Sequence, residues 1–88
     1  MIHYPTPENA AEAAALVRQL EGALAELQLG EAERMAYELV RFHWRREGCR
    51  LEGAYAVLEG IATRNVGAAL GECDRLRQLF APAGRLAA

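Results

Sequence analysis

His43 and Glu47 stand four residues apart in a segment with helical apolar spacing, so both side chains share one ridge of the expected helix. An imidazole and a carboxylate at this spacing can hold a metal ion from a helix. The nearest further ligand type is Cys49, which points to a different side of a continuous helix. We therefore expect a solvated contact between His43 and Glu47, and the sequence predicts neither a metal site nor a cofactor.

Residue types that carry out catalysis are scarce. The chain has no serine, no glycine-rich phosphate loop and no paired-acid constellation. Covalent catalysis needs a nucleophile beside a base that activates it, and no such pairing is recognisable. The sequence predicts a protein that is not an enzyme and has no catalytic residue.

Basic side chains form a single cluster. It consists of Arg41, Arg45, Arg46 and Arg50, and Trp44, the only tryptophan of the chain, lies among them. Arginines grouped in this way could meet nucleic-acid phosphates. Interleaved glutamates cancel much of the positive field. Nucleic acid is therefore the less favoured partner, and ion pairs to solvent or to a protein are expected.

Length and composition indicate one small helical domain, residues 1–88. The chain is 52% apolar with a net charge of −2, and it lacks both a membrane-spanning run and a secretion signal. We expect a cytoplasmic protein with no membrane partner. Cys49 and Cys73 would then be reduced, small buried residues, and a disulfide between them is the alternative if the chain is exported.

Apolar spacing predicts three helices. The first spans about 7–29, with Thr6 as its cap and Pro7 in its first turn, and Gly30 ends it in a left-handed conformation. The second spans about 31–64, and the third spans about 66–80 and is stopped by Pro82 and Gly84. The expected fold is all-α: an antiparallel two-helix hairpin with a shorter third helix folded back.

The expected helix 31–64 carries two apolar faces. The first face consists of Tyr37, Val40, Trp44, Leu51, Tyr55 and Leu58. The second face, nearly opposite, consists of Met35, Leu39, Phe42, Cys49, Gly53, Val57 and Gly60. Two faces require two packing partners. We expect the first face to pack along helix 7–29, which leaves the second face for the third helix and for another protein.

Glycines inside helix 31–64 allow two interpretations. Each costs about 1 kcal/mol relative to alanine, so either Gly48 kinks or splits the helix, or Gly53 and Gly60 form a groove for another helix. The third helix is the first candidate to fill that groove. If it does, Met35, Leu39 and Phe42, at the N-terminal end of the second face, would remain open. The predicted partner-binding residues are Met35, Leu39, Phe42, Arg45, Arg46 and Cys49.

Two segments together resemble the YscE-like co-chaperones of bacterial type III secretion needles. They run from Val17 to Leu27 (VRQLEGALAEL) and, with Trp44–Glu47 (WRRE), from Leu51 to Leu58 (LEGAYAVL). The resemblance covers about residues 10–62 and implies a helical hairpin. It also implies a helical-repeat chaperone as the partner, with which the hairpin holds a secreted helical needle subunit. A self-associating homodimer, or a small regulator of another protein or of nucleic acid, are the alternatives.

Overall fold

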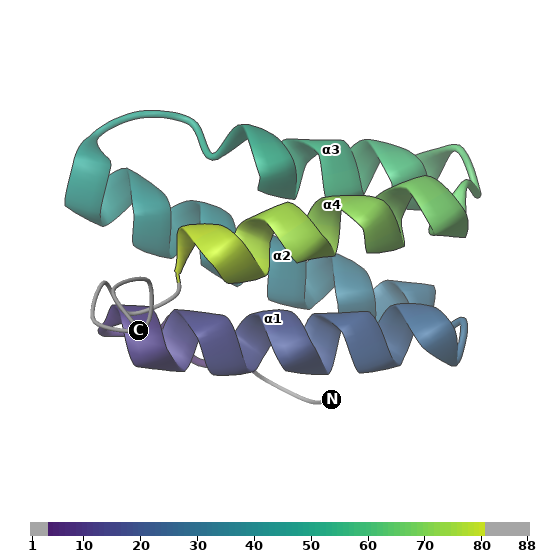
Figure 1. Cartoon of the computed structure of the whole chain (residues 1–88), viewed down its shortest axis with the longest axis horizontal. Helices are drawn as coiled ribbons and strands as arrows, with labels where there is room; N and C mark the ends of the chain where they lie inside the picture. The colour runs from purple at the N-terminus through teal and green to yellow at the C-terminus, as the bar shows by residue number, and fades with distance from the viewer. Residues whose placement is uncertain (1–3, 81–88) are drawn as a thin grey trace.

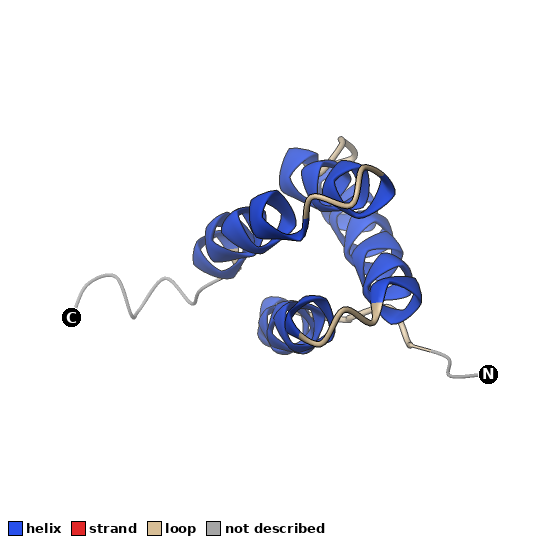
Figure 2. Cartoon of the chain, turned by 90° about the vertical axis from the view of Figure 1, so that its right-hand side faces the viewer, coloured by secondary structure: helices blue, strands red, loops and turns tan. Residues whose placement is uncertain are grey.

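The computed structural model describes residues 4–80 as four helices that surround one core. They are α1 (Ala10–Ala25), α2 (Leu29–Glu47), α3 (Glu52–Ala62) and α4 (Val66–Leu79). Successive helices run in opposite directions (Figure 1). α1 and α3 each pack against both α2 and α4, so the helices form a ring when seen end-on (Figure 2). The all-α prediction is confirmed for these residues, whereas the expected number of three helices is wrong.

The predicted helix 31–64 is two helices because α2 ends at Gly48. Gly48 has φ 69°, a left-handed conformation that favours glycine, and its N–H donates to the Trp44 carbonyl at 2.8 Å. The chain then reverses, and Leu51, only 4% exposed, anchors the start of α3 in the core. The interpretation that a glycine splits the helix is therefore correct at Gly48.

The beginning of α1 differs from the predicted one. Asn9 is its cap, and its side-chain oxygen accepts from the Glu12 N–H at 2.9 Å. Thr6 is not the cap, because its hydroxyl donates to the carboxylate of Glu38 on α2. Glu38 is 8% exposed and also accepts from Arg41 at 2.8 Å, so this buried carboxylate is paired. The segment before α1 is thereby attached to α2.

The turn after α1 does not use Gly30, which lies inside α2. Leu27 takes the left-handed conformation instead, with φ 59°. The Gln28 N–H donates to the Ala23 carbonyl at 2.8 Å, which is the hydrogen bond of a Schellman cap. The same cap ends α3, where Arg64 has φ 61°. The predicted break near 64–65 is confirmed, while Pro82 and Gly84 lie outside the described residues.

Two glycines of α3 allow α4 to approach closely. A Cβ built on Gly60 would lie 3.0 Å from the Ala69 Cβ, and one built on Gly53 would lie 2.8 Å from the Leu76 Cδ2. The prediction of a glycine groove filled by the third predicted helix is therefore confirmed, with α4 as its occupant. An ion pair also joins α4 to α1, since the Arg77 guanidinium lies 3.3 Å from the Glu21 carboxylate.

Candidate functional site

Three of the predicted partner-binding residues lie in the core of the chain. Met35, Leu39 and Phe42 are 6%, 0% and 2% exposed. The Phe42 ring packs edge-on against the ring of Phe80, which follows α4, with centroids 5.7 Å apart. The prediction that these side chains stay open is wrong. Because helix 31–64 splits, the chain supplies one more helix than expected, and the part of the second face that lies on α2 turns inward.

The other three predicted residues, Arg45, Arg46 and Cys49, lie on the surface. The Arg46 guanidinium stands over the Phe42 ring, 5.2 Å from its centroid. The expectation that Cys49 is a buried residue is wrong, since it follows the end of α2 and is exposed. Both cysteines are free thiols in the described structure.

The first face, expected to pack along the first helix, lies largely in solvent within α2. Tyr37 is 49% exposed and Trp44 is 57% exposed, while Val40 is half-buried beside them. Arg41 and Arg45 are exposed on the same helix. We name these five residues the outer face of α2. It combines two aromatic rings with guanidinium groups, the side chains most often found at the centre of protein interfaces.

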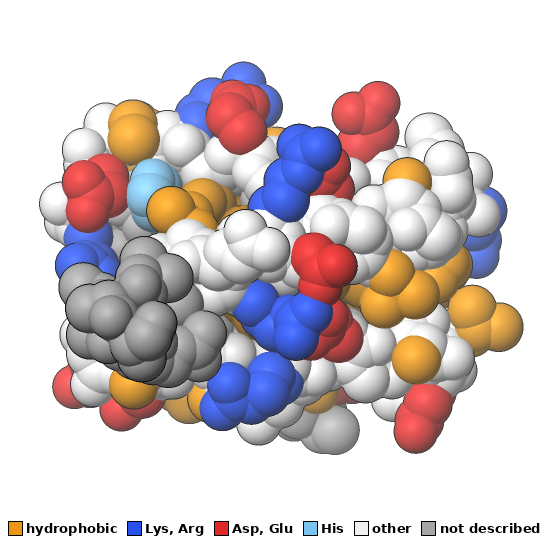
Figure 3. Space-filling model, viewed as in Figure 1, with side chains coloured by type: hydrophobic (Ala, Val, Ile, Leu, Met, Phe, Trp, Pro, Cys, Tyr) orange, Lys and Arg blue, Asp and Glu red, His pale blue; other side chains and the backbone are white. Residues whose placement is uncertain are grey.

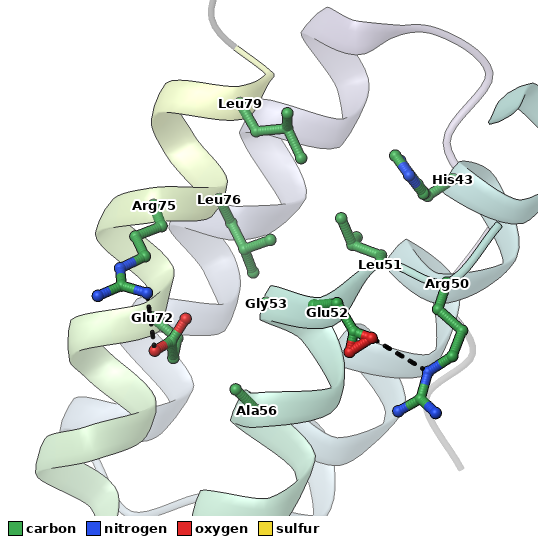
Figure 4. Close-up of a pocket in the computed structure, with 10 residues that line it drawn as sticks. All are labelled: His43, Arg50, Leu51, Glu52, Gly53, Ala56, Glu72, Arg75, Leu76 and Leu79. Carbon is green, nitrogen blue, oxygen red and sulfur yellow. Dashed lines mark ion pairs between the residues drawn. The ribbon is translucent and has the colours of Figure 1, made fainter.

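A groove lies between the first turns of α3 and the second half of α4, with a volume of ≈ 690 Å³. Leu51, Leu76 and Leu79 line it with apolar surface, and Figure 4 shows their side chains converging on it. Two ion pairs lie at its edge: Arg50 with Glu52 at 3.4 Å, and Arg75 with Glu72 at 3.7 Å. On the face that carries α3 and α4, acidic and basic side chains alternate (Figure 3). The groove therefore offers a ligand an apolar floor with both acidic and basic side chains at its edge.

Two arginines of the basic cluster pair with carboxylates of the same chain. Arg41 pairs with Glu38, and the Arg50 guanidinium stands 4.2 Å from the centre of the Tyr55 ring and also pairs with Glu52. These contacts hold the cations in fixed places and offset part of their charge. The arrangement suits orientation of a protein partner better than a continuous row of phosphates.

Cys49 Sγ lies 3.6 Å from His43 Nε2, a pairing that sequence reasoning missed. On a continuous helix the two residues point apart, but the left-handed Gly48 carries Cys49 back beside the last turns of α2. The available signal was the order Arg45, Arg46, Gly48, since basic residues followed by glycine are typical of a helix end.

The second thiol, Cys73, lies at 0% exposure on α4. Desolvation raises its pKa to about 12, and the nearby carboxylate of Glu21 adds to the increase. Cys73 is therefore protonated at neutral pH and behaves as a small apolar core residue.

Comparisons of the chain with protein families, curated proteins and solved structures found no match. Within residues 4–80, no helix has both the length and the hydropathy to cross a membrane. The exposed side chains described above are therefore the basis for a proposed function.

Proposed function

We propose that this protein is a small helical interaction module that binds another protein through the outer face of α2. The observation that carries the proposal is the exposure of Trp44, the only tryptophan, at 57% beside Tyr37 at 49%. Burying these two rings in a complex removes a large apolar area from water. About half of each side chain is still in water, and a partner would bury that remaining area.

Charge indicates the kind of partner. Arg41 and Arg45 lie on the outer face of α2 with the two rings, which favours a partner that presents apolar side chains with carboxylates beside them. An amphipathic helix or a helical repeat has this pattern. Arg41 also pairs with Glu38, which holds the guanidinium before a partner arrives and lowers the entropy lost on binding.

The resemblance to YscE-like proteins supports a more specific proposal of the same class. In it, the chain is a cytoplasmic co-chaperone, its partner is a helical-repeat chaperone, and the pair holds a type III secretion needle subunit. Trp44, in the second resembling segment, lies on the outer face of α2. This specific proposal rests on the resemblance, while the general one rests on the exposed rings.

The experiment uses the single tryptophan as its reporter. A photo-crosslinking amino acid replaces Tyr37 in the source cell, the crosslinked protein is identified, and the purified partner is titrated against the chain while Trp44 emission is recorded. We expect a blue shift of that emission on binding. Trp44→Ala, measured by calorimetry, weakens binding by about 10- to 100-fold, as central interface residues do.

Leu79→Ala is the matched control, because Leu79 is also large and is 55% exposed but lies on α4 in the groove. It leaves the affinity within about twofold, a change of less than 1 kcal/mol. Equal losses in both variants, or a loss in Leu79→Ala alone, would refute the outer face of α2 as the binding site. If Trp44 emission shifts to the blue when the chain alone is concentrated, the partner at this face is a second copy of the chain and not a different protein.

A further inference from the structure

His43 and Cys49 have the separation of two ligands of one zinc ion. Their Nε2 and Sγ atoms lie 3.6 Å apart. A zinc ion about 2.3 Å from sulfur and about 2.0 Å from nitrogen, at a tetrahedral angle, places those atoms roughly 3.5 Å apart. Cys49 is exposed and His43 is half-buried, so a metal ion can reach both from solvent.

The end of α2 holds the pair in place. His43 lies in the regular helix, and the Gly48 N–H closes the last turn on the Trp44 carbonyl at 2.8 Å. Leu51, 4% exposed, fixes the chain on the other side of Cys49. Since the backbone on both sides of the thiol is anchored, binding a metal ion would need little ordering of the chain.

The neighbouring cations are bound elsewhere. The Arg46 guanidinium lies over the Phe42 ring at 5.2 Å, and the Arg50 guanidinium lies over the Tyr55 ring at 4.2 Å. Both are thereby held by aromatic rings rather than left to approach a metal ion beside Cys49. If two such Cys–His pairs met at one divalent ion, the negative charges of the two thiolates would cancel the charge of the ion, and the imidazoles would bind in their neutral form. Each thiol would release its proton to solvent on coordination.

One chain supplies only half of a tetrahedral site. Among residues 4–80, no group of three or more His, Cys, Asp or Glu side chains lies close enough to share a metal ion. A second copy related by a two-fold axis would bring the same two side chains to the same point, giving a Cys₂His₂ set. We propose that His43 and Cys49 are half of a site for a thiophilic divalent cation, zinc above all, completed by a second copy of this chain.

The test uses Co²⁺ as the spectroscopic probe on the full chain, purified free of metal and kept reduced with a phosphine. We expect a sulfur-to-cobalt charge-transfer band and tetrahedral d–d bands that saturate at one Co²⁺ per two chains. Sedimentation then shows the mass doubling over the same range of Co²⁺, and Zn²⁺ displaces the cobalt. This site is distinct from the outer face of α2, so either proposal can fail alone.

Cys49→Ser removes the charge-transfer band and the dimer, and His43→Gln weakens Co²⁺ binding by about tenfold or more. Cys73→Ala is the matched control, because it deletes the other thiol and leaves the bands unchanged. Circular dichroism verifies that each variant is folded. Saturation at one Co²⁺ per chain without a dimer, an unchanged band in Cys49→Ser, or no band at all would each overturn the shared site and leave a simple Cys–His contact.

Discussion

Truncation of Phe42 separates a core residue from a binding residue. Phe42→Ala deletes a ring that is 2% exposed and packs 5.7 Å from the Phe80 ring. Core truncations of this type cost about 3–5 kcal/mol, and the total stability of a domain this small is about 5–10 kcal/mol. At about 4–8 °C per kcal/mol, the melting temperature should fall by about 12–40 °C. Urea unfolding followed by far-ultraviolet circular dichroism measures the loss.

Trp44→Ala is the matched control, since it removes an even larger ring two residues further along α2 that is 57% exposed. We expect its unfolding free energy to fall by at most about 2 kcal/mol, less than in Phe42→Ala, because more than half of the side chain is already in water. The double variant Phe42→Ala, Phe80→Ala should then lose less than the sum of the single losses, by about 0.5–1.5 kcal/mol for the ring pair. A Phe42→Ala chain as stable as Trp44→Ala would refute the burial of the second face and restore Phe42 as a surface residue.

Three further substitutions test the close approach of α3 and α4, the helix cap and the buried thiol. Gly60→Ala should lower the unfolding free energy by about 1–2 kcal/mol, because its Cβ would meet the Ala69 Cβ at 3.0 Å. Gly71 has open space around it, so Gly71→Ala should raise the unfolding free energy by about 1 kcal/mol in the same urea assay. Leu27→Gly relieves a left-handed residue that is 68% exposed, so it should raise the melting temperature by a few degrees, a net gain of about 0.5–1 kcal/mol; a lower melting temperature would contradict the cap. The pKa of Cys73 is raised to about 12 in the folded chain, above about 8.5 in the unfolded chain. Its contribution to stability is therefore complete below pH ~8.5 and is lost as the pH rises towards 12. Between pH 8 and pH 11, the urea midpoint of the unmodified chain should fall more steeply with pH than that of Cys73→Ala.

The sequence predicted the helices well where local signals were strong. Asn65 caps α4, its side chain accepting from the Ala68 N–H at 3.2 Å, and the predicted break before it is confirmed. The packing of α4 on Gly53 and Gly60 also follows from local pattern, since glycines on one helix face permit a close neighbour. The Asn65 cap joins residues three apart in the chain, so spacing alone finds it, whereas Gly53 and Leu76 meet only once α4 packs on α3.

Which apolar face of helix 31–64 enters the core could not be predicted from local spacing. Within α2 the two faces are distinct as predicted, but beyond Gly48 they are not, since Leu51 of the first face is 4% exposed and Cys49 of the second face is exposed. Which stripe enters the core depends on the partners that surround it, and these change once the chain reverses at Gly48. The Cys49–His43 contact depends on the same reversal, so one missed helix end accounts for both errors.

The residues on the core-facing side of α2 explain why its outer face stays outside. The core-facing side of α2 includes Ala32 and Ala36, both at 0% exposure, which let neighbouring helices approach closely. Tyr37 and Trp44 lie on the other side of α2, and turning them inward would carry Leu39, at 0% exposure, out of the core. The core is closed by other side chains, and about half of each ring is left in water. Their exposure is therefore a consequence of good internal packing rather than of a missing helix, and a partner that covers them would add apolar contact without disturbing the core.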